Sequence, residues 1–337
     1  MLRIPFTELA STLAGILVSI GFEPARAEHC ARLFAETTRD GIYSHGIERF
    51  PRFLDTIRNG SVDIHATPER TLQSGSIERW NGRRGPGNLN AWASMARAIE
   101  LSREHGIGCV ALANTNHWMR GGTYGWQAAD AGVIGICWTN TLANLPPWGA
   151  TTPAIGNNPL IIAVPRPSGH VVLDMAMSQF SYGALSMYRQ KGQPLPVDGG
   201  FDAEGHLTRD PAAVEASQRL LPIGYWKGSG LAFVLDMLAA LLSGGLATHQ
   251  IPTDPLRETS LSQIFLALNL AQLQPAEESA RTADTIVESL LRSNPENNPN
   301  TVRYPGQQVL KTRAENLALG LPVREDLWVQ LQNELPL

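Results

Sequence analysis

The sequence is poor in cysteine. Cys30, Cys109 and Cys137 are its only three cysteines in 337 residues, and no pair of them stands at the CxxC spacing of a metal motif. Disulfide frameworks are typical of short secreted chains with an even number of cysteines, so this set argues against one and favours a reducing compartment. We therefore predict a cytoplasmic protein without a metal site.

Charge is scarce as well. Charged residues make up 17% of the chain, and its formal net charge is −4 at pH 7. Such a composition offers no basic surface for nucleic acid or heparin, which leaves small molecules as the expected partners. The 43% hydrophobic content is enough for a large buried core, and the length predicts two or three structural units.

No hydrophobic run fits a membrane-spanning helix. The longest candidate, residues 230–247, carries Asp236 near its middle and Gly244-Gly245 near its end. A spanning helix needs about 20 apolar residues and rarely tolerates a central carboxylate. The segment therefore predicts a buried core helix with Ser229 as its N-cap. The expected packing stripe consists of Leu231, Leu235, Leu238 and Leu242.

The N-terminal segment is also apolar. Residues 9–22 precede Ala25-Arg26-Ala27, which mimics the small-x-small pattern of a signal-peptidase site. Apolar side chains nevertheless recur here at helical spacing, and polar side chains lie elsewhere around the helix. We expect an amphipathic helix whose apolar face consists of Phe6, Leu9, Leu13, Ile16, Leu17 and Ile20.

Hydrophobic periodicity divides the chain into a helical start and a mixed remainder. Helices are predicted over residues 6–21, 24–39 and from about 51 to the stop signal Asn59-Gly60. From residue 78 onward, β-like runs alternate with helical segments such as 89–104, which predicts an α/β layer structure. The predicted strands are 108–113, 134–139, 160–164, 171–175 and 262–270.

Two further segments are rich in turn residues, and a third forms the C-terminal end. Residues 193–208 predict a loop or irregular hairpin inserted between two helices, and residues 292–304 predict a polar loop. The last thirty or so residues predict a short helix that packs back on the N-terminal unit.

Several familiar catalytic signatures are missing. The chain has no Walker loop, HExxH, GxSxG or zinc-type cluster. Its nearest approaches to a dinucleotide-binding turn are Gly106-Ile107-Gly108 and Gly228-Ser229-Gly230. Neither is predicted to follow a strand and open a helix, as that mechanism requires. Local motifs alone therefore do not predict a dinucleotide enzyme.

Ser44-His45-Gly46 is the first candidate site. Arg49 follows His45 by four residues, so the two side chains share a face if the segment winds as a turn. An imidazole with an ordinary pKa of about 6.5 can deliver a proton at neutral pH, and a guanidinium can clamp a carboxylate. The pair suits a keto acid. The alternative is a surface histidine with a solvated arginine at a helix start.

Other polar clusters follow the predicted strands. Residues 114–122, which include His117, come directly after a buried strand, where open α/β sheets bind ligands. Residues 148–159 and 173–178 could line a cofactor cleft or could merely be turns. Lys227 lies beside glycines near a helix start and could meet a phosphate there.

Taken in order, these blocks resemble the malate/L-lactate dehydrogenase-type oxidoreductase family, which includes sulfolactate dehydrogenases and is unrelated to the Rossmann lactate dehydrogenases. The resemblance runs over nearly the whole chain. It is carried by residues 43–53, 116–127, 136–140, 146–149, 180–183, 195–201 and 224–230.

The resemblance implies a fold and an assembly. The expected fold is a non-Rossmann, three-layer α/β/α mixed sheet with a helical N-terminal domain. Residues 1–70 would form that domain with 310–337 packed on it, and residues 71–309 would form the α/β domain for cofactor binding and dimerisation. A homodimer with its site near the subunit boundary is expected.

The resemblance also implies an activity and a set of site residues. The expected reaction is NADH-dependent reduction of a sugar-derived 2-keto acid at C2, with His45 as the proton donor. Ser44, Arg49 and His117 would hold the substrate. The expected cofactor contacts are His170, Val171, Val172, Leu173, Asp174, Met175, Ala176, Trp226, Lys227, Gly306, Gln307 and Gln308.

Two questions stay open at this stage. Relatives are expected to carry Gly-His-Glu where this chain has Gly306-Gln307-Gln308, so a carboxylate for a ribose hydroxyl is missing and NADPH is possible. The family also includes malate, sulfolactate, ureidoglycolate and imino acid dehydrogenases. A non-enzymatic metabolite-binding protein on the same scaffold is the alternative from another class.

Overall fold

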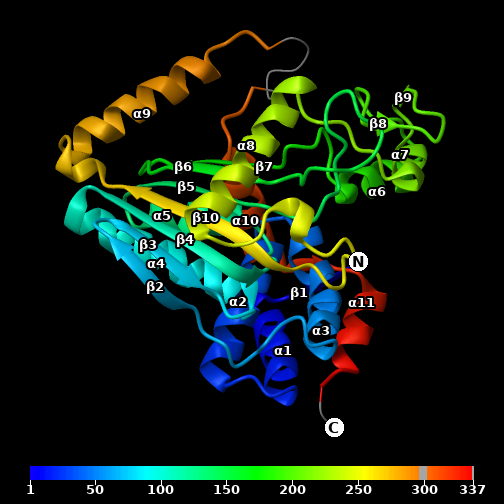
Figure 1. The fold of residues 1–337 in the computed structure, drawn as a ribbon, viewed down its shortest axis with the longest axis horizontal. Coiled ribbons are helices and arrows are strands. Elements are labelled where there is room, and N and C mark those ends of the chain that lie inside the picture. The colour runs from blue at the N-terminus through cyan, green and yellow to red at the C-terminus, as the bar shows by residue number, and fades with distance from the viewer. Residues whose placement is uncertain (296–301, 336–337) are drawn as a thin grey trace.

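The computed structural model describes residues 1–295 and 302–335. Figure 1 shows a central sheet with helices on both faces and a group of helices at one end, where both termini lie. The predicted polar loop at 292–304 falls partly outside the described residues.

A seven-stranded mixed sheet forms the middle layer, in the order β2-β3-β4-β10-β5-β6-β7. Only β3 and β4 run parallel, and every other neighbouring pair is antiparallel. The five strands predicted from the sequence are confirmed as β4, β5, β6, β7 and β10, and the structure adds β2 and β3, which were not predicted. The strand bounds are β2 Glu69–Ser74, β3 Ile77–Asn81, β4 Ile107–Asn116, β5 Ile134–Thr139, β6 Leu160–Val164, β7 Val171–Met175 and β10 Thr259–Leu268.

Alternation along β4 builds a core on each face of the sheet. Val110 and Leu112 pack under α4 (Gly87–His105) and α5 (Gly122–Asp130). Cys109 and Ala111 point the other way, toward α8 (Trp226–Ser243). Because successive strand residues face opposite sides, a strand buried on both faces is apolar throughout. The predicted three-layer α/β/α arrangement is therefore confirmed.

The two ends of the chain share one core. Leu9, Leu13, Ile16 and Leu17 of the first helix are buried, as its amphipathic pattern predicts, and they pack in one cluster with Trp328. β1 (Leu2–Ile4) pairs antiparallel with β11 (Leu321–Val323). The helices of this unit are α1 Phe6–Ser19, α2 Pro24–Arg39, α3 Phe50–Arg58, α10 Gln307–Leu319 and α11 Glu325–Gln332.

The remaining elements lie outside the seven-stranded sheet. The predicted hairpin at 193–208 is present as β8 (Gly200–Phe201) paired with β9 (Leu207–Thr208). It lies between two short helices, α6 (Tyr182–Gln190) and α7 (Pro211–Ser217). Beyond β10, α9 (Ala276–Leu291) extends along one edge of the molecule (Figure 1).

The predictions for α8 are wrong in two respects. The helix begins at Trp226, so Ser229 lies inside it and is no N-cap; the Ser229 hydroxyl instead accepts a hydrogen bond from the Trp148 N–H at 3.0 Å. The helix is also no buried core helix, because 28% of its residues are buried. Of the predicted leucine stripe, only Leu235 is buried.

Small residues explain this orientation of α8. Gly228, Ala232 and Ala239 share its buried face with Leu235, since small side chains let the helix approach the sheet closely. The larger apolar side chains point outward. By length and composition α8 is the one described helix that could cross a membrane, yet Asp236 accepts hydrogen bonds from Asn140 and Thr248 and ties it to the α/β unit.

Candidate active site

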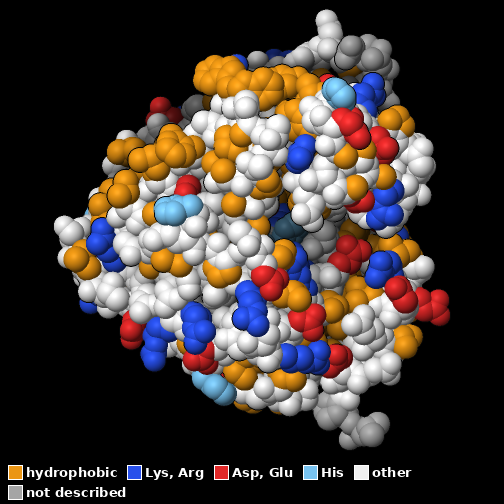
Figure 2. Space-filling view, turned by 45° about the vertical axis from the view of Figure 1, so that its right-hand side comes forward, with side chains coloured by type: hydrophobic (Ala, Val, Ile, Leu, Met, Phe, Trp, Pro, Cys, Tyr) orange, Lys and Arg blue, Asp and Glu red, His pale blue; other side chains and the backbone are white. Residues whose placement is uncertain are grey.

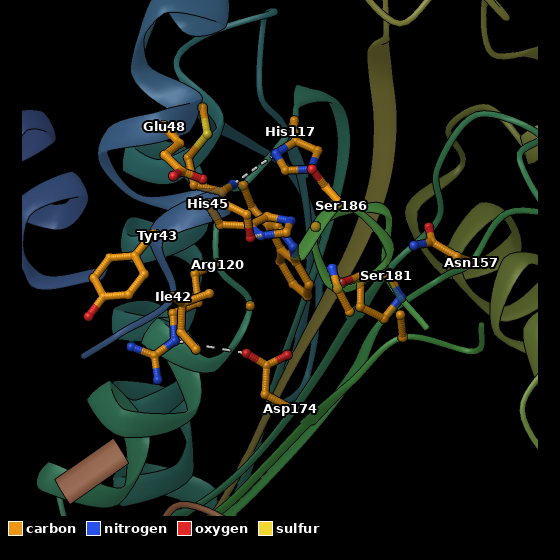
Figure 3. A pocket seen from close by; sticks show the side chains of 18 of the residues that line it. Ile42, Tyr43, His45, Glu48, His117, Arg120, Asn157, Asp174, Ser181 and Ser186 are labelled. Atoms are coloured by element: carbon orange, nitrogen blue, oxygen red, sulfur yellow. Dashed lines mark hydrogen bonds and ion pairs between the residues drawn. The ribbon is translucent and has the colours of Figure 1, made fainter. Parts of the chain in front are cut away.

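A cavity of about 560 Å³ opens between the N-terminal helical unit, the sheet and α6. Figure 3 shows His45 and His117 on one wall and Asn157 on the opposite side. The volume lies in the usual range of small-molecule sites, about 300–1,000 Å³. Its polar and ionisable lining residues include Tyr43, Ser44, His45, Glu48, His117, Arg120, Thr139, Thr141, Asn157, Asp174, Ser181, Ser186 and Gln190.

His45 is held by a tight turn between two short 3₁₀ helices, Tyr43–His45 and Ile47–Arg49. Gly46 joins them against α2, where an added Cβ would lie 2.4 Å from the Thr38 hydroxyl. That hydroxyl accepts a hydrogen bond from the Ile47 N–H at 2.9 Å. The glycine is therefore required by close packing, and the packing fixes the direction of His45.

The neighbouring hydroxyl orients the His45 ring. Ser44 Oγ lies 3.0 Å from His45 Nδ1. With Nδ1 engaged in this way, Nε2 is the ring nitrogen left to exchange a proton with a ligand.

His117 faces His45 across the wall of the cavity. The two rings stack with centroids 5.9 Å apart and planes 18° apart. His117 Nδ1 accepts a hydrogen bond from the Met119 N–H at 3.1 Å. Because that nitrogen is an acceptor, the ring is neutral and carries its hydrogen on Nε2. His117 is thus a hydrogen-bond donor toward the site.

Burial and positive neighbours keep this histidine pair neutral. Burial, with the charges of Arg49 and Arg120, lowers the pKa of His45 from 6.5 to about 4. Burial, with Arg49 and His45 itself, lowers the pKa of His117 well below 6.5. Both rings are therefore uncharged at pH 7 without a ligand. A bound anion would offset the positive charge and raise both pKa values.

Arg49 supplies an unpaired positive charge next to the pair. Its guanidinium group makes no hydrogen bond or ion pair within residues 1–295 and 302–335, and only its backbone N–H donates, to Gly46. Burial beside Arg52 lowers the pKa of Arg49 to about 10, so the guanidinium stays charged at pH 7. The structure places it in a smaller pocket with Glu258, and His117 lines both this pocket and the main cavity.

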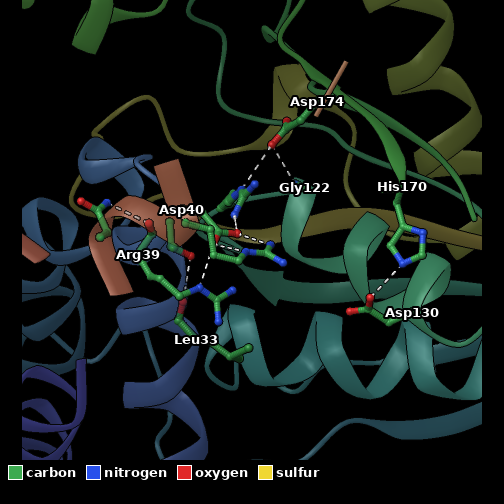
Figure 4. A network of polar contacts seen from close by, with 11 residues as sticks. Leu33, Arg39, Asp40, Gly122, Asp130, His170 and Asp174 are labelled. Carbon is green, nitrogen blue, oxygen red and sulfur yellow. Dashed lines mark hydrogen bonds and ion pairs between the residues drawn. The ribbon is translucent and has the colours of Figure 1, made fainter. Parts of the chain in front are cut away.

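Arg120 brings a second positive charge to the cavity and is anchored from behind. Its Nη1 donates to Asp40 at 2.7 Å, and Asp40 also accepts hydrogen bonds from Arg39 and Arg313 (Figure 4). Burial alone would raise the pKa of Asp40, but these three guanidinium groups outweigh it and lower the pKa to about 2. The carboxylate is therefore ionised and holds Arg120 in place.

The three predicted cofactor segments meet along one edge of the sheet. β7 is the edge strand, and its residue Asp174 and Ala176 just beyond its end reach the cavity. At one end the Val172 N–H donates to Pro305, just before α10, and at the other the Ile223 N–H donates to Met177, just before α8. Two helix N-termini thus flank a strand segment about 16 Å long at 3.3 Å per residue.

The side chains predicted to contact the cofactor differ in their exposure and in their hydrogen bonds. Trp226 is 65% exposed, and Lys227 is exposed beside it in the first turn of α8. His170 is engaged at both nitrogens, with the Arg166 N–H at 2.9 Å and Asp130 at 3.0 Å.

The turn at the start of α10 has its own local contacts. Gly306 has a φ of +95°, and an added Cβ would lie 3.1 Å from the Val172 nitrogen. Gln307 accepts a hydrogen bond from the Tyr304 N–H, and Gln308 accepts one from Arg303. These two amides therefore occupy the place where the sequence lacks a carboxylate.

Asn157 lies in the segment 148–159, which the sequence left open as a cleft lining or a turn, and the structure places it in the cavity lining. Its Oδ1 accepts hydrogen bonds from Thr141 Oγ1 at 3.1 Å and Asn144 Nδ2 at 3.2 Å. Because the oxygen is taken, the orientation of the amide is determined, and Nδ2 faces the cavity without a partner among the described residues (Figure 3). The sequence indicated a possible cleft lining for this segment through its turn residues and did not single out the amide of Asn157.

A mixed sheet that is not a Rossmann fold, with a neutral histidine pair and two guanidinium groups at its edge, defines an α/β enzyme built to hold a small anion. The chain belongs to the malate/L-lactate dehydrogenase family, which matches residues 4–332. It is thus an oxidoreductase, and its family consists of NAD(P)H-dependent dehydrogenases.

Similarity to particular relatives refines this assignment. The chain is 45% identical to 2,3-diketo-L-gulonate reductase of Escherichia coli O127:H6 over 331 residues, covering 98% of this chain and 99% of that protein. Sulfolactate dehydrogenase from Methanocaldococcus jannaschii superposes with a TM-score of 0.91 at 26% identity, covering 99% and 96% of the two chains.

Malate dehydrogenase from Pyrococcus horikoshii OT3 superposes with a TM-score of 0.89 at 25% identity, covering 99% of this chain and 94% of that one. These findings confirm the family resemblance and the fold class predicted from the sequence. The sequence blocks that carry the resemblance point to 2,3-diketo-L-gulonate reductase in particular, in agreement with the similarity at full length.

Proposed function

We propose that the protein reduces 2,3-diketo-L-gulonate to 3-keto-L-gulonate with NADH, by hydride transfer to C2. The observation that carries the proposal is the stacked pair of neutral histidines in a cavity that Asp174 of the edge strand β7 also lines, with the Arg49 guanidinium in the adjoining pocket. The sequence identity of 45% to 2,3-diketo-L-gulonate reductase supports the choice of substrate.

The residues along β7 fit a nicotinamide dinucleotide. The N-termini of α8 and α10 flank the strand, and helix N-termini favour phosphate groups through free N–H groups and the helix dipole. Trp226 and Lys227 would contact the cofactor at one end and Gly306 at the other, with Asp174 and Ala176 beside the nicotinamide. When bound, the cofactor supplies the hydride. NADH is the proposed cofactor. NADPH is the alternative, because the turn Gly306-Gln307-Gln308 carries no carboxylate for a ribose hydroxyl.

The substrate carboxylate prepares His45 for proton transfer. We propose that it binds to Arg49, with Ser44 and His117 holding the adjacent oxygens. Burial is the main cause of the His45 pKa of about 4, and the charges of Arg49 and Arg120 add to it. The carboxylate offsets these charges and raises the pKa, so we propose that His45 takes up a proton as the substrate binds. Protonated His45 then donates from Nε2 to the C2 oxygen, while its Nδ1–H is held by Ser44 at 3.0 Å.

The test is a substrate panel followed through nicotinamide absorbance. Purified protein is incubated with NADH or NADPH and with 2,3-diketo-L-gulonate, oxaloacetate, sulfopyruvate, the keto partner of ureidoglycolate and a cyclic imino acid. The proposal predicts the highest kcat/KM for 2,3-diketo-L-gulonate with NADH. Preference for another substrate would overturn the substrate assignment, and turnover of none would overturn the activity.

We propose also that the protein is a cytoplasmic homodimer, with residues 71–309 carrying both the cofactor and the subunit contacts. The outer face of α8 supports this proposal, because its apolar side chains are exposed in a single chain. Figure 2 shows apolar side chains gathered toward the top of the molecule, where α8 and α9 lie in Figure 1. The exposed residues are Phe233, Val234, Met237, Leu238 and Leu241 on α8 and Ile286, Leu290 and Leu291 on α9.

A further inference from the structure

The cavity wall formed by α6 is uncharged and carries two polar side chains, Ser186 and Gln190. Residues at helical spacing from Gly183 to Gln190 turn one face of α6 toward the cavity. On this face the Gln190 side-chain amide donates to the Ser186 hydroxyl at 3.3 Å. Each of these groups can both donate and accept hydrogen bonds. The wall therefore suits a ligand with hydroxyl groups.

Glu48 adds an exposed carboxylate to the same cavity. The Glu48 carboxylate makes no hydrogen bond or ion pair within the described part of the chain, and it forms no ion pair with Arg49, the next residue. A carboxylate accepts hydrogen bonds from hydroxyl groups and repels other anions. Figure 3 shows Glu48 and Ser186 among the residues around His45 and His117.

The positive charge of the site is matched to one carboxylate. Arg120 is the one Lys or Arg in the described lining of the cavity, and Asp40 already binds it. Arg49 lies in the adjoining pocket. A substrate with a second carboxylate or a sulfonate would find no further cation in the described lining of the cavity, since Arg189 of α6 pairs with Glu215 outside it, and would meet Glu48. A cavity of about 560 Å³ also has room beyond a three-carbon keto acid.

We infer that Glu48, Ser186 and Gln190 form a subsite for the uncharged, hydroxylated tail of the substrate. The subsite selects a polyhydroxylated 2-keto acid by hydrogen bonds and rejects dicarboxylates by charge repulsion, a combination of attraction and repulsion that underlies specificity. The inference rests on the proposed function, because it assigns the tail to the substrate whose keto acid end lies at His45.

Steady-state kinetics of three variants test the subsite. The substrates are 2,3-diketo-L-gulonate, pyruvate as a short keto acid, and oxaloacetate as a dicarboxylate. The Ser186→Ala/Gln190→Ala double variant should lower kcat/KM for 2,3-diketo-L-gulonate about tenfold or more, with pyruvate changed less than about twofold. Glu48→Gln should raise kcat/KM for oxaloacetate about tenfold. Lys191→Ala is the matched control, because Lys191 is exposed just beyond α6 and lies outside the cavity. It should leave kcat/KM unchanged for both 2,3-diketo-L-gulonate and oxaloacetate.

Calorimetric binding gives a readout that does not depend on turnover. L-Gulonate, which has the hydroxylated tail, and L-malate, which has a second carboxylate, are titrated into the same proteins. The double variant should weaken L-gulonate binding about tenfold and leave L-malate unchanged, and Glu48→Gln should strengthen L-malate binding. Equal losses for both ligands, or no change for either, would overturn the subsite. Selective loss of L-gulonate binding in a protein that reduces none of the keto acids would uphold the subsite and overturn the proposed function.

Discussion

Asp40 and Arg120 lie 80 positions apart and form a buried ion pair with a distance of 2.7 Å. Arg313 joins the same carboxylate from α10 through two hydrogen bonds of 2.7 Å. Since Arg120 reaches the cavity and α10 begins at the predicted cofactor turn, one carboxylate connects the N-terminal unit, the substrate cavity and the C-terminal helix (Figure 4).

Replacement of Asp40 by Asn should destabilise the fold. The variant leaves buried guanidinium groups without their counter-charge, and removal of one partner of a buried ion pair typically costs about 3–5 kcal/mol. Urea unfolding at pH 7 measures the loss. Asp55→Asn, which removes a carboxylate from an exposed pair with Arg58, is the control and should change stability far less. Equal losses in the two variants would contradict the account.

The contribution of Asp40 should also depend on pH in a defined direction. Its pKa is about 2 in the folded protein against 3.8 as the ordinary value. A lowered carboxyl pKa contributes stability above pH 4, and this contribution disappears as the pH falls toward 2. The difference in unfolding free energy between wild type and Asp40→Asn should therefore shrink between pH 4 and pH 2.

Binding of the proposed product, 3-keto-L-gulonate, which carries the same carboxylate as the substrate, should take up a proton at pH 7. His45 is neutral in the free protein because its pKa is about 4, and the bound carboxylate raises that pKa. Calorimetric titrations with 3-keto-L-gulonate in buffers of different ionisation enthalpy count the protons. We expect net uptake that approaches one proton for wild type and a clear reduction for His45→Gln. Identical proton counts in the two proteins would show that another group titrates.

Asn157→Asp should impair the reaction without disturbing the fold. The substitution keeps the shape of the side chain and replaces the donor Nδ2, which faces the cavity, by an acceptor. Loss of one hydrogen bond and the added negative charge should lower kcat/KM about tenfold or more. Asn59→Asp, on a surface loop outside the cavity, is the matched control. Unchanged kinetics for Asn157→Asp would remove this amide from the site.

A charge on the outer face of α8 should separate the proposed dimer. Leu241 is 66% exposed in the single chain, and Leu241→Glu would bury a carboxylate if this face is a subunit contact. Light scattering after size exclusion should give the dimer mass for wild type and a shift toward 36.6 kDa, the mass of one chain, for the variant. The same mass for both proteins would exclude this face as the contact.

Elements of the fold can be predicted from the sequence where one physical signal dominates. The strands 134–139, 160–164 and 171–175 agree with the structure at both ends, because short apolar runs between turn residues have few alternatives. α8 was misread because it is apolar all around, and its orientation depends on the small residues Gly228, Ala232 and Ala239, which a hydrophobicity pattern does not weight.

The candidate site was readable only in part. His45 and His117 stand out locally among glycines and aromatics, and the structure brings them together. Asp40 and Arg313 are separated by 273 positions and carry no local motif. Ser186 and Gln190 resemble any polar residues on an exposed helix. Contacts that depend on the tertiary fold leave no pattern in a single sequence.

Turnover of His45→Ala with 2,3-diketo-L-gulonate and NADH tests the central claim most directly. General acid catalysis typically contributes about 10²–10⁴-fold, so kcat should fall by about that factor while cofactor binding, followed by NADH fluorescence, changes little. His105→Ala, at an exposed histidine outside the cavity, is the control. A kcat for His45→Ala within about threefold of wild type, far below a loss of about 10²-fold, would contradict the role of His45 as the proton donor.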